Sequence, residues 1–345
     1  MKKYNVGIIG YGWASTAHIQ AINATSQAQV VAVYSSRPQD AAELSARHGG
    51  RIETYTDLDS MLRRTDLHAV SVCSFPHQHA SHVIAAARAG KHVIIEKPIS
   101  LNLADALAVA EAIRAAGVRS CVCYECRFSS QFIATKAVID DGLLGRIHYG
   151  EIDYYHGVGP WYGQFRWNTS RRDGGSSLLS AGCHALDALL LCMGGDIASV
   201  SSHATKSGNA IFGKYEYGTT SVTLVKFRDG RLGKVASVID CLQPYYFHTH
   251  LVGSEGSLLD NRFHSERIAG LNRHAWSTLS MKLLDSGDVS DHPYQKQFEA
   301  FFAAIERGEE MPLTSFQEAL VSHRVVLAAD RSVETASEVR MDEFA

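Results

Sequence analysis

A lysine ends a short β-branched run in the segment HVIIEKP, residues 92–98. The valine and two isoleucines before it predict a short buried strand. Pro98 has no N–H and disfavours helical backbone at the preceding residue, so we expect Lys97 in an extended or turn conformation. In open α/β sheets the carboxyl ends of the strands bind ligands. Lys97 is therefore a candidate for chemistry on a ligand; an ordinary surface lysine is the alternative.

A second candidate group lies in the apolar stretch 174–195, GGSSLLSAGCHALDALLLCMGG. Its leucines predict a helix on which Ser180 and His184, four residues apart, share a face. Asp187 follows one turn later and is expected to orient the imidazole ring of His184. Histidine titrates near neutral pH, so His184 suits a general acid or base; a hydrogen-bonded core histidine is the alternative.

Aromatic residues precede this predicted helix in a glycine-containing loop: Trp161, Tyr162, Phe165 and Trp167. Aromatic faces suit a sugar ring, and core packing is the alternative.

A glycine turn follows the first predicted strand, Asn5–Ile9, and precedes a predicted helix over Ala14–Ala24. Gly10 allows a tight turn, and Gly12 lets the backbone approach a pyrophosphate at the helix N-terminus. Strand, glycine turn and helix are the context that a dinucleotide fingerprint requires, although the third position is serine. We assign Trp13 to the same cofactor site.

The end of the second predicted strand, Gln29–Tyr34, carries Ser35, Ser36 and Arg37. Sites specific for NAD usually place an acidic residue here to bind the ribose 2′-hydroxyl. A guanidinium with two hydroxyls suits a 2′-phosphate instead. The sequence therefore favours NADP over NAD. The alternative is that Arg37 is an ordinary solvated charge in a loop.

Two groups of potential metal ligands lack the spacing of a metal site. Cys121, Cys123 and Cys126 contain one C-x-x-C pair without a second pair or a paired histidine. His77, His79 and His82 have no accompanying carboxylate and fit polar residues at a helix start. We expect no metal, and buried free thiols in a reducing compartment.

Composition limits the class of protein. The 345 residues suit two domains, and 46% apolar with 20% charged residues describes a globular protein. The net charge of −3 gives no basic face for nucleic acid. We expect neither signal peptide nor transmembrane helix, and hence no membrane and a cytoplasmic location.

Strand and helix alternate up to residue 124, which predicts a doubly wound parallel sheet. From residue 125 on, strands dominate, and Asp229-Gly230 between two apolar runs predicts a hairpin. We therefore expect an α/β domain over residues 1–124 and an α+β domain with a mostly antiparallel open sheet over residues 125–345. Residues 262–290 are expected to form a long loop. The apolar residues on both alternations of 219–239 predict a homodimer or homotetramer through this sheet.

Taken together, these motifs resemble the Gfo/Idh/MocA family, the glucose–fructose oxidoreductase and inositol dehydrogenase group. The resemblance covers essentially the whole chain. It rests on Gly10-Tyr-Gly12 with His18, Ser74…His79, Glu96-Lys97-Pro98, Arg127-Phe128, the run 141–146 (DGLLGR) and Gly182-Cys-His184…Asp187.

The resemblance implies a Rossmann domain and an oxidoreductase that moves a hydride between NAD(P) and a secondary alcohol or ketone of a sugar or cyclitol. It makes Lys97 and His184 catalytic. Many dehydrogenases of the family carry aspartate where this chain has Ser180, which cannot act as a carboxylate base. Further assignments follow from it: Ser180, Arg127, Trp167 and Asp187 to the substrate, and Ser74, His79, Glu96 and Lys97 to the cofactor side.

Two alternatives remain open at this point. One is an NAD-dependent glycoside hydrolase or lyase that acts through a transient keto-sugar. The other is a non-catalytic cofactor-sensing regulator of the same fold.

Overall fold

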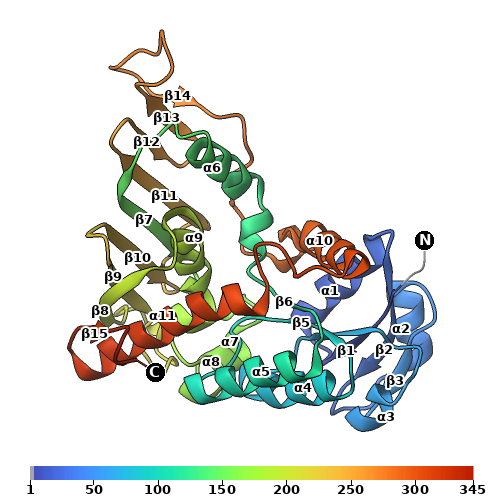
Figure 1. Cartoon of the computed structure of the whole chain (residues 1–345). Coiled ribbons are helices and arrows are strands. Elements are labelled where there is room, and N and C mark those ends of the chain that lie inside the picture. The colour runs from blue at the N-terminus through green and yellow to red at the C-terminus, as the bar shows by residue number, and fades with distance from the viewer. Residues whose placement is uncertain (1–3, 345) are drawn as a thin grey trace. The chain divides into compact units, whose positions relative to one another are not determined.

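The computed structural model describes residues 4–344, which contacts divide into two units (Figure 1). The first joins the chain up to Glu125 to residues 288–320. The second joins residues 126–287 to the chain from Val321 on. The helix Tyr294–Arg307 (α10) thus returns to the first unit, which the sequence pattern did not indicate.

The first unit is built on a six-stranded parallel sheet in the order β3-β2-β1-β4-β5-β6. Its strands are β1 Tyr4–Ile9, β2 Ala28–Tyr34, β3 Glu53–Tyr55, β4 Ala69–Val72, β5 His92–Ile95 and β6 Ser120–Val122. Its other helices are α1 Trp13–Ala24, α2 Ala41–His48, α3 Leu58–Leu62, α4 Pro76–Arg88 and α5 Leu103–Ala116. Figure 1 shows α4 and α5 on one face of the sheet and α1 and α10 on the other. The predicted doubly wound Rossmann sheet is confirmed.

Burial explains why these short segments form strands. Val93, Ile94 and Ile95 of β5 are fully buried, as are Ile8 and Ile9 of β1. Strands covered on both faces by helices need continuous apolar runs rather than alternation. The runs therefore end where the sheet ends, and the polar residues that follow gather at its carboxyl edge.

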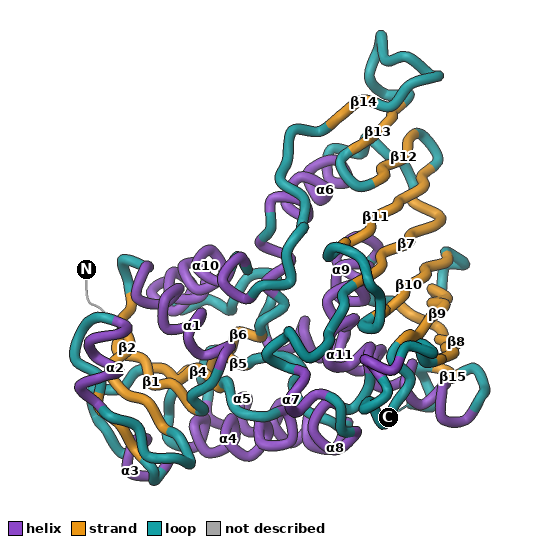
Figure 2. Tube along the Cα trace, turned by 180° about the vertical axis from the view of Figure 1, so that it is seen from behind, coloured by secondary structure: helices purple, strands orange, loops and turns teal. Residues whose placement is uncertain are grey.

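The second unit is built on a nine-stranded sheet in the order β14-β13-β12-β11-β7-β10-β9-β8-β15, drawn in orange in Figure 2. Its strands are β7 Ile147–Tyr155, β8 Ile197–Thr205, β9 Thr220–Phe227, β10 Leu232–Val238, β11 Tyr246–Gly253, β12 Gly256–Leu259, β13 Arg262–Ser265, β14 Ser277–Thr278 and β15 Val339–Arg340. Among the strand pairs of this sheet that lie within the described residues, only β7–β10 is parallel. The mostly antiparallel sheet and the β9–β10 hairpin are confirmed.

Helices and helical turns complete the second unit. They are α6 Ser130–Asp140, α7 Phe165–Asn168, α8 Arg171–Gly174, a π-helical segment Leu178–Gly182, α9 Cys183–Met193 and a 3₁₀ turn Ala210–Phe212. Helix α11, Phe316–Thr335, runs on from the first unit; 3₁₀ turns also occur at Glu125–Phe128 and Val289–Asp291.

Glycines let α9 approach the sheet closely. A Cβ on Gly150 of β7 would lie 2.3 Å from the sulfur of Met193, and one on Gly233 of β10 would lie 2.7 Å from Leu189. Both neighbours belong to α9. The helix therefore packs directly over β7 and β10, which makes it a core element of this unit.

The prediction that residues 262–290 form a loop is wrong for two segments, β13 and β14, which pair with each other at the sheet edge. These strands are too short and too polar to give an alternating pattern.

The stretch Arg171–Met193 is, among the described residues, the one helical segment apolar and long enough to cross a membrane. However, 89% of its most apolar window is buried inside the protein, as in the core helix of a globular unit.

Candidate functional site

The turn after β1 has the geometry of a phosphate cradle. Gly10 has φ +93°, and a Cβ there would lie 2.8 Å from the backbone of Ser74, so a side chain cannot be accommodated. A Cβ on Gly12 would meet no atom within 4 Å, which leaves open space above the turn. Helix α1 begins at Trp13 with no acidic residue in its first turn. The N–H groups of this first turn point to where an anion can bind.

The end of β2 presents the predicted 2′-phosphate residues at the same edge of the sheet. Ser35 is buried, and its Oγ accepts a hydrogen bond from the backbone N–H of Arg37 at 3.3 Å. Ser36 and the Arg37 side chain are exposed. The arginine is thus accessible to a ligand at the strand end.

His79 ties the end of β4 to the segment after β5. Its Nδ1 lies 2.7 Å from the carbonyl oxygen of Pro98, and its Nε2 lies 2.8 Å from that of Ser74. Burial lowers the pKa of His79, so the ring is neutral at pH 7 and donates to one of these oxygens at a time. Its imidazole is 1% exposed, so its influence on a cofactor passes through the backbone that it holds. The Ser74 hydroxyl bonds His82 Nδ1 at 2.8 Å, and burial lowers the pKa of His82 to about 4.

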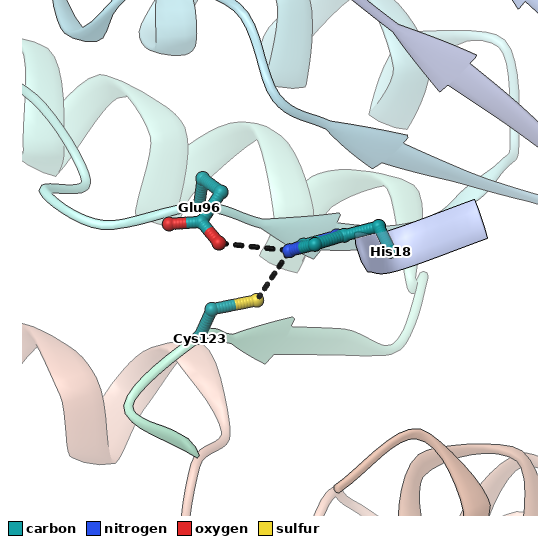
Figure 3. Close-up of side chains that lie close together, drawn as sticks. All are labelled: His18, Glu96 and Cys123. Atoms are coloured by element: carbon teal, nitrogen blue, oxygen red, sulfur yellow. Dashed lines mark hydrogen bonds and ion pairs between the residues drawn. The ribbon is translucent and has the colours of Figure 1, made fainter. Parts of the chain in front are cut away.

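A buried charged pair lies directly behind the Lys97 segment (Figure 3). The Nε2 of His18, on α1, donates to the Oε1 of Glu96 at 2.8 Å, and its Nδ1 lies 2.7 Å from the hydroxyl of Ser71. Burial by itself lowers the pKa of His18, but the adjacent Cys73 and Glu96 raise it to about 10. Burial also opposes ionisation of Glu96, yet His18 and Lys97 hold its pKa well below the ordinary range. The pair is therefore ionised at neutral pH.

Two further groups complete the cluster around Glu96. The Tyr294 hydroxyl, on α10, donates to Glu96 Oε1 at 2.7 Å. The Sγ of Cys123 lies 3.9 Å from His18 Nε2. Sequence reasoning missed Tyr294, because only the return of the chain brings it back to the first unit.

Glu96 also fixes the backbone of the candidate catalytic lysine. Its Oε2 accepts a hydrogen bond from the Lys97 N–H at 3.0 Å, and the Lys97–Pro98 peptide is cis. Lys97 itself is half-buried. With both carboxylate oxygens bonded inside the protein, Glu96 acts here on Lys97 and His18, and a direct contact of Glu96 with the cofactor stays a prediction.

The candidate residues of the second unit lie on a helix with an irregular start. Ser180 lies in the π-helical segment and His184 in the first turn of α9, and both side chains are under 5% exposed. The Ser180 hydroxyl donates to the carbonyl of Ser176 at 2.8 Å. The predicted helix is present over both residues, but the expectation that they share a face assumed α-helical spacing, which the π-helical segment changes. Insertions of this kind are frequent at functional sites.

The predicted orientation of His184 by Asp187 is wrong. The Asp187 carboxylate binds Arg127 in a bidentate pair, with Nε–Oδ2 and Nη2–Oδ1 both at 2.7 Å. The Ser322 hydroxyl, on α11, donates to Oδ1 at 2.6 Å. A fork-shaped guanidinium matches a carboxylate better than an imidazole one turn away. Arg127 and Asp187 thus form a buried ion pair, and their contact with a substrate stays a prediction.

The aromatic loop before α9 is partly accessible. Trp161 is 60% exposed and donates through its indole N–H to the Gly157 carbonyl at 2.9 Å. Trp167, on α7, is half-buried. Tyr162 donates to the carbonyl of Gly287 at 2.6 Å, which ties this loop to the end of the segment after β14.

Sequence reasoning also missed a buried carboxyl group on α11. Asp330 Oδ2 accepts a hydrogen bond from Ser176 at 2.8 Å, next to the π-helical segment. Burial raises the pKa of Asp330 to about 7. The sequence shows only that Asp330 is an acidic residue within an apolar helical run. An acidic residue on the exposed side of a helix gives the same pattern, so the sequence does not reveal its burial.

Comparison with known proteins identifies both units. Residues 4–124 match the family model of the oxidoreductases with an NAD-binding Rossmann fold, and residues 132–259 match the GFO/IDH/MocA C-terminal domain. A myo-inositol 2-dehydrogenase of Thermotoga maritima is 25% identical over 338 residues, covering 98% of both chains.

Solved structures agree on the fold. A scyllo-inositol dehydrogenase of Lactobacillus casei superposes with a TM-score of 0.80 at 20% identity, covering 99% of both chains. A levoglucosan dehydrogenase in complex with NADH and levoglucosan superposes with a TM-score of 0.83 at 22% identity, covering 99% of this chain and 100% of that one.

Proposed function

The chain belongs to the Gfo/Idh/MocA oxidoreductase family and is a nicotinamide-dependent oxidoreductase of sugars or cyclitols, in which we propose that Lys97 and His184 are the catalytic residues. The observation that carries this assignment is the carboxyl end of β5. There a buried, charged Glu96 holds the backbone N–H of Lys97, directly before the cis Pro98. Such internal support is what a catalytic side chain needs to keep its position.

The residues at the carboxyl edge of the parallel sheet fit a dinucleotide. Gly10 excludes a side chain, Gly12 leaves open space, and the first turn of α1 offers N–H groups to a pyrophosphate. When bound, the nicotinamide supplies the hydride acceptor or donor. We assign Ser35, Ser36 and Arg37 to a 2′-phosphate, which makes NADP the preferred cofactor, and Trp13, Ser74 and His79 to the same side.

The proton chemistry falls to this chain's own side chains. Oxidation of a secondary alcohol requires removal of the hydroxyl proton as the hydride leaves carbon. His184 takes that proton, because an imidazole has its ordinary pKa near the working pH. Lys97 is assigned to polarise the substrate oxygen.

Substrate contacts are assigned to Ser180, Arg127, Trp167 and Asp187. The Ser180 hydroxyl can bond a substrate hydroxyl. The half-buried Trp167 supports stacking on a sugar ring. The buried ion pair of Arg127 and Asp187 joins the 3₁₀ turn Glu125–Phe128 to α9, the helix that carries His184.

We assign cofactor binding to residues 1–124, and the substrate site and the oligomer contact to residues 125–345. A cytoplasmic location and a homodimer or homotetramer complete the proposal. Leu224 and Leu232 support the oligomer, since they are 59% and 53% exposed on neighbouring strands. Large exposed apolar side chains on a sheet face usually mark an interface.

The test is a screen of monosaccharides, cyclitols and glycosidic or anhydro sugars for reduction of NAD⁺ and NADP⁺ in parallel. Native enzyme should accumulate reduced cofactor, and Lys97→Met and His184→Asn should each lose ~10²–10⁴-fold in kcat with little change in cofactor binding. The pH profile of alcohol oxidation should show one dominant ionisation that rises as His184 loses its proton.

Other outcomes would overturn parts of the proposal. Turnover without net cofactor reduction would indicate a glycoside hydrolase or lyase, and cofactor binding without turnover would indicate a regulator. A His184→Asn enzyme of near-native rate and unchanged pH profile would remove His184 from the mechanism. If Arg37→Ala leaves the NADP/NAD ratio of kcat/KM unchanged, the assignment of the 2′-phosphate site is wrong.

A further inference from the structure

Two histidines and a glutamate meet on the open face of the nine-stranded sheet. His248 and His250 lie two residues apart on β11, so they point to the same face. The antiparallel register places His250 directly opposite Glu151 of β7. We call Glu151, His248 and His250 the sheet cluster.

The ligand-type atoms of the sheet cluster are close enough to share one ion. One nitrogen from each histidine and one oxygen from Glu151 all lie within 4.8 Å of one another. With zinc–ligand bonds of ~2.0–2.2 Å, tetrahedral ligand atoms lie about 3.4 Å apart, so rotations that move each atom by ~1 Å suffice. All three residues are half-buried in the single chain, and they lie on the sheet face to which we assign the oligomer contact.

His248 already has the outer contact that a metal-binding histidine needs. Its Nδ1 lies 3.3 Å from Asp260 Oδ1 and 2.9 Å from the Tyr246 hydroxyl. Asp260 is itself fixed, because its Oδ1 accepts from the Thr249 N–H at 3.0 Å. The Tyr246 hydroxyl in turn donates to Asp260 Oδ2 at 2.8 Å, so Nδ1 bonds the hydroxyl and lies within ion-pair distance of the carboxylate. Metal-bound histidines usually have such a partner at their second nitrogen. With Nδ1 engaged, Nε2 is the nitrogen available for coordination.

The charges around the sheet cluster favour a cation. Lys234 Nζ donates to Glu151 Oε1 and to Asp153 Oδ2, both at 2.8 Å. The three carboxylates of Glu151, Asp153 and Asp260 carry more negative charge than the single ammonium of Lys234 offsets.

We propose that Glu151, His248 and His250 bind a divalent transition-metal ion of the zinc class, with Asp260 positioning His248. Two imidazoles and one carboxylate are ligands that zinc prefers, whereas magnesium and calcium take oxygen ligands. Three protein ligands leave a fourth position for water.

The test is a calorimetric titration of tag-free, chelator-treated full-length protein with Zn²⁺. One ion per chain should bind, and His250→Ala should weaken binding by at least ~10-fold. Asp260→Asn should weaken it by ~10–100-fold, since it removes the positioning contact. The matched control is His203→Ala, an exposed histidine on β8 of the same sheet, which should bind as the native protein does.

Two further readouts keep the proposal open to refutation. A Co²⁺ complex should show tetrahedral d–d bands without a thiolate charge-transfer band, which separates this site from any site that uses a cysteine such as Cys123. Zn²⁺ should raise the melting temperature of the native protein and of His203→Ala, but not of His250→Gln, which keeps a polar side chain if His250→Ala folds poorly. The absence of binding to native protein, a thiolate band, or equal affinity in the two His250 variants and the native chain would overturn the proposal.

Discussion

Replacing Glu96 with glutamine should destabilise the first unit and change how its stability depends on pH. The amide can still accept from Tyr294 and His18 but no longer offsets the charge of a His18 that is buried completely. Removing one partner of a buried ion pair costs ~3–5 kcal/mol. The retained hydrogen bonds place Glu96→Gln near ~3 kcal/mol, or a fall in melting temperature of about 6–12 °C for a unit of this size.

The pH dependence gives the sharper test. The pKa of His18 is about 10 in the folded protein and 6.5 ordinarily, so its stabilisation is complete below pH 6.5 and is lost as pH rises through 10. That rise corresponds to at most about 5 kcal/mol. The pKa of Glu96 is lowered from 4.5, so its contribution is present above pH 4.5 and is lost in acid. Native stability from this pair is therefore greatest between about pH 4.5 and 6.5 and declines toward pH 10.

The assay is urea unfolding of native protein and variants at pH 6, 8 and 9.5. In Glu96→Gln the decline in unfolding free energy above pH 6.5 should flatten, because burial lowers the pKa of His18 and only Cys73 is then left to raise it. Tyr294→Phe is a matched control that removes one hydrogen bond, costs ~1.5–3 kcal/mol and keeps the native pH slope. Cys73→Ser tests the other group beside the ring. If Glu96→Gln keeps the native slope and Cys73→Ser loses it, the assignment of the slope to the His18–Glu96 pair is refuted.

Three further predictions concern the second unit. Asp187→Asn should cost ~3–5 kcal/mol of unfolding free energy, because it leaves the buried Arg127 guanidinium without its carboxylate; urea unfolding measures this, and a loss below ~1 kcal/mol contradicts it. Gly182→Ala should cost ~1–3 kcal/mol of unfolding free energy, because the new Cβ would lie 2.3 Å from the Cβ of Ser237. Adding Ser237→Gly should restore the stability; if it does not, this clash is not the cause of the loss. Leu224→Arg should shift the mass measured by light scattering toward the monomer; a native chain that is already monomeric at micromolar concentration would refute the sheet contact.

The first unit could be predicted from the sequence to a large extent because its signals are local. The β-branched run before Lys97 is a strand because helices cover it on both sides, and Gly10 has the positive φ that a tight turn requires. The residues that follow these strands then lie at the same edge of a parallel sheet. Position along the chain therefore predicted position in space for Gly12, Ser74 and Lys97.

The partners of the charged groups could not be predicted in the same way. Glu96 bonds His18, 78 residues earlier, and Tyr294, 198 residues later. The choice of Arg127 rather than His184 as the partner of Asp187 depends on a guanidinium arriving from 60 residues away. A helical-spacing argument sees only neighbours on one helix, and it also assumes 3.6 residues per turn, which the π-helical segment before His184 does not have.

The sheet cluster shows the same limit in a form that bears on function. His248 and His250 carry the period-two spacing of a strand face, which a sequence displays, but their third partner Glu151 lies about a hundred residues earlier on the neighbouring strand. Cross-strand register, which no local pattern encodes, decides whether such residues meet. Site residues at strand ends can thus be predicted once the sheet is recognised as parallel. Site residues on a sheet face can be predicted only when the pairing and register of the strands are known. Metal titration of His250→Ala against His203→Ala consequently tests the β7–β11 register as well as the metal site, since a shift by one residue would turn His248 and His250 to the opposite face.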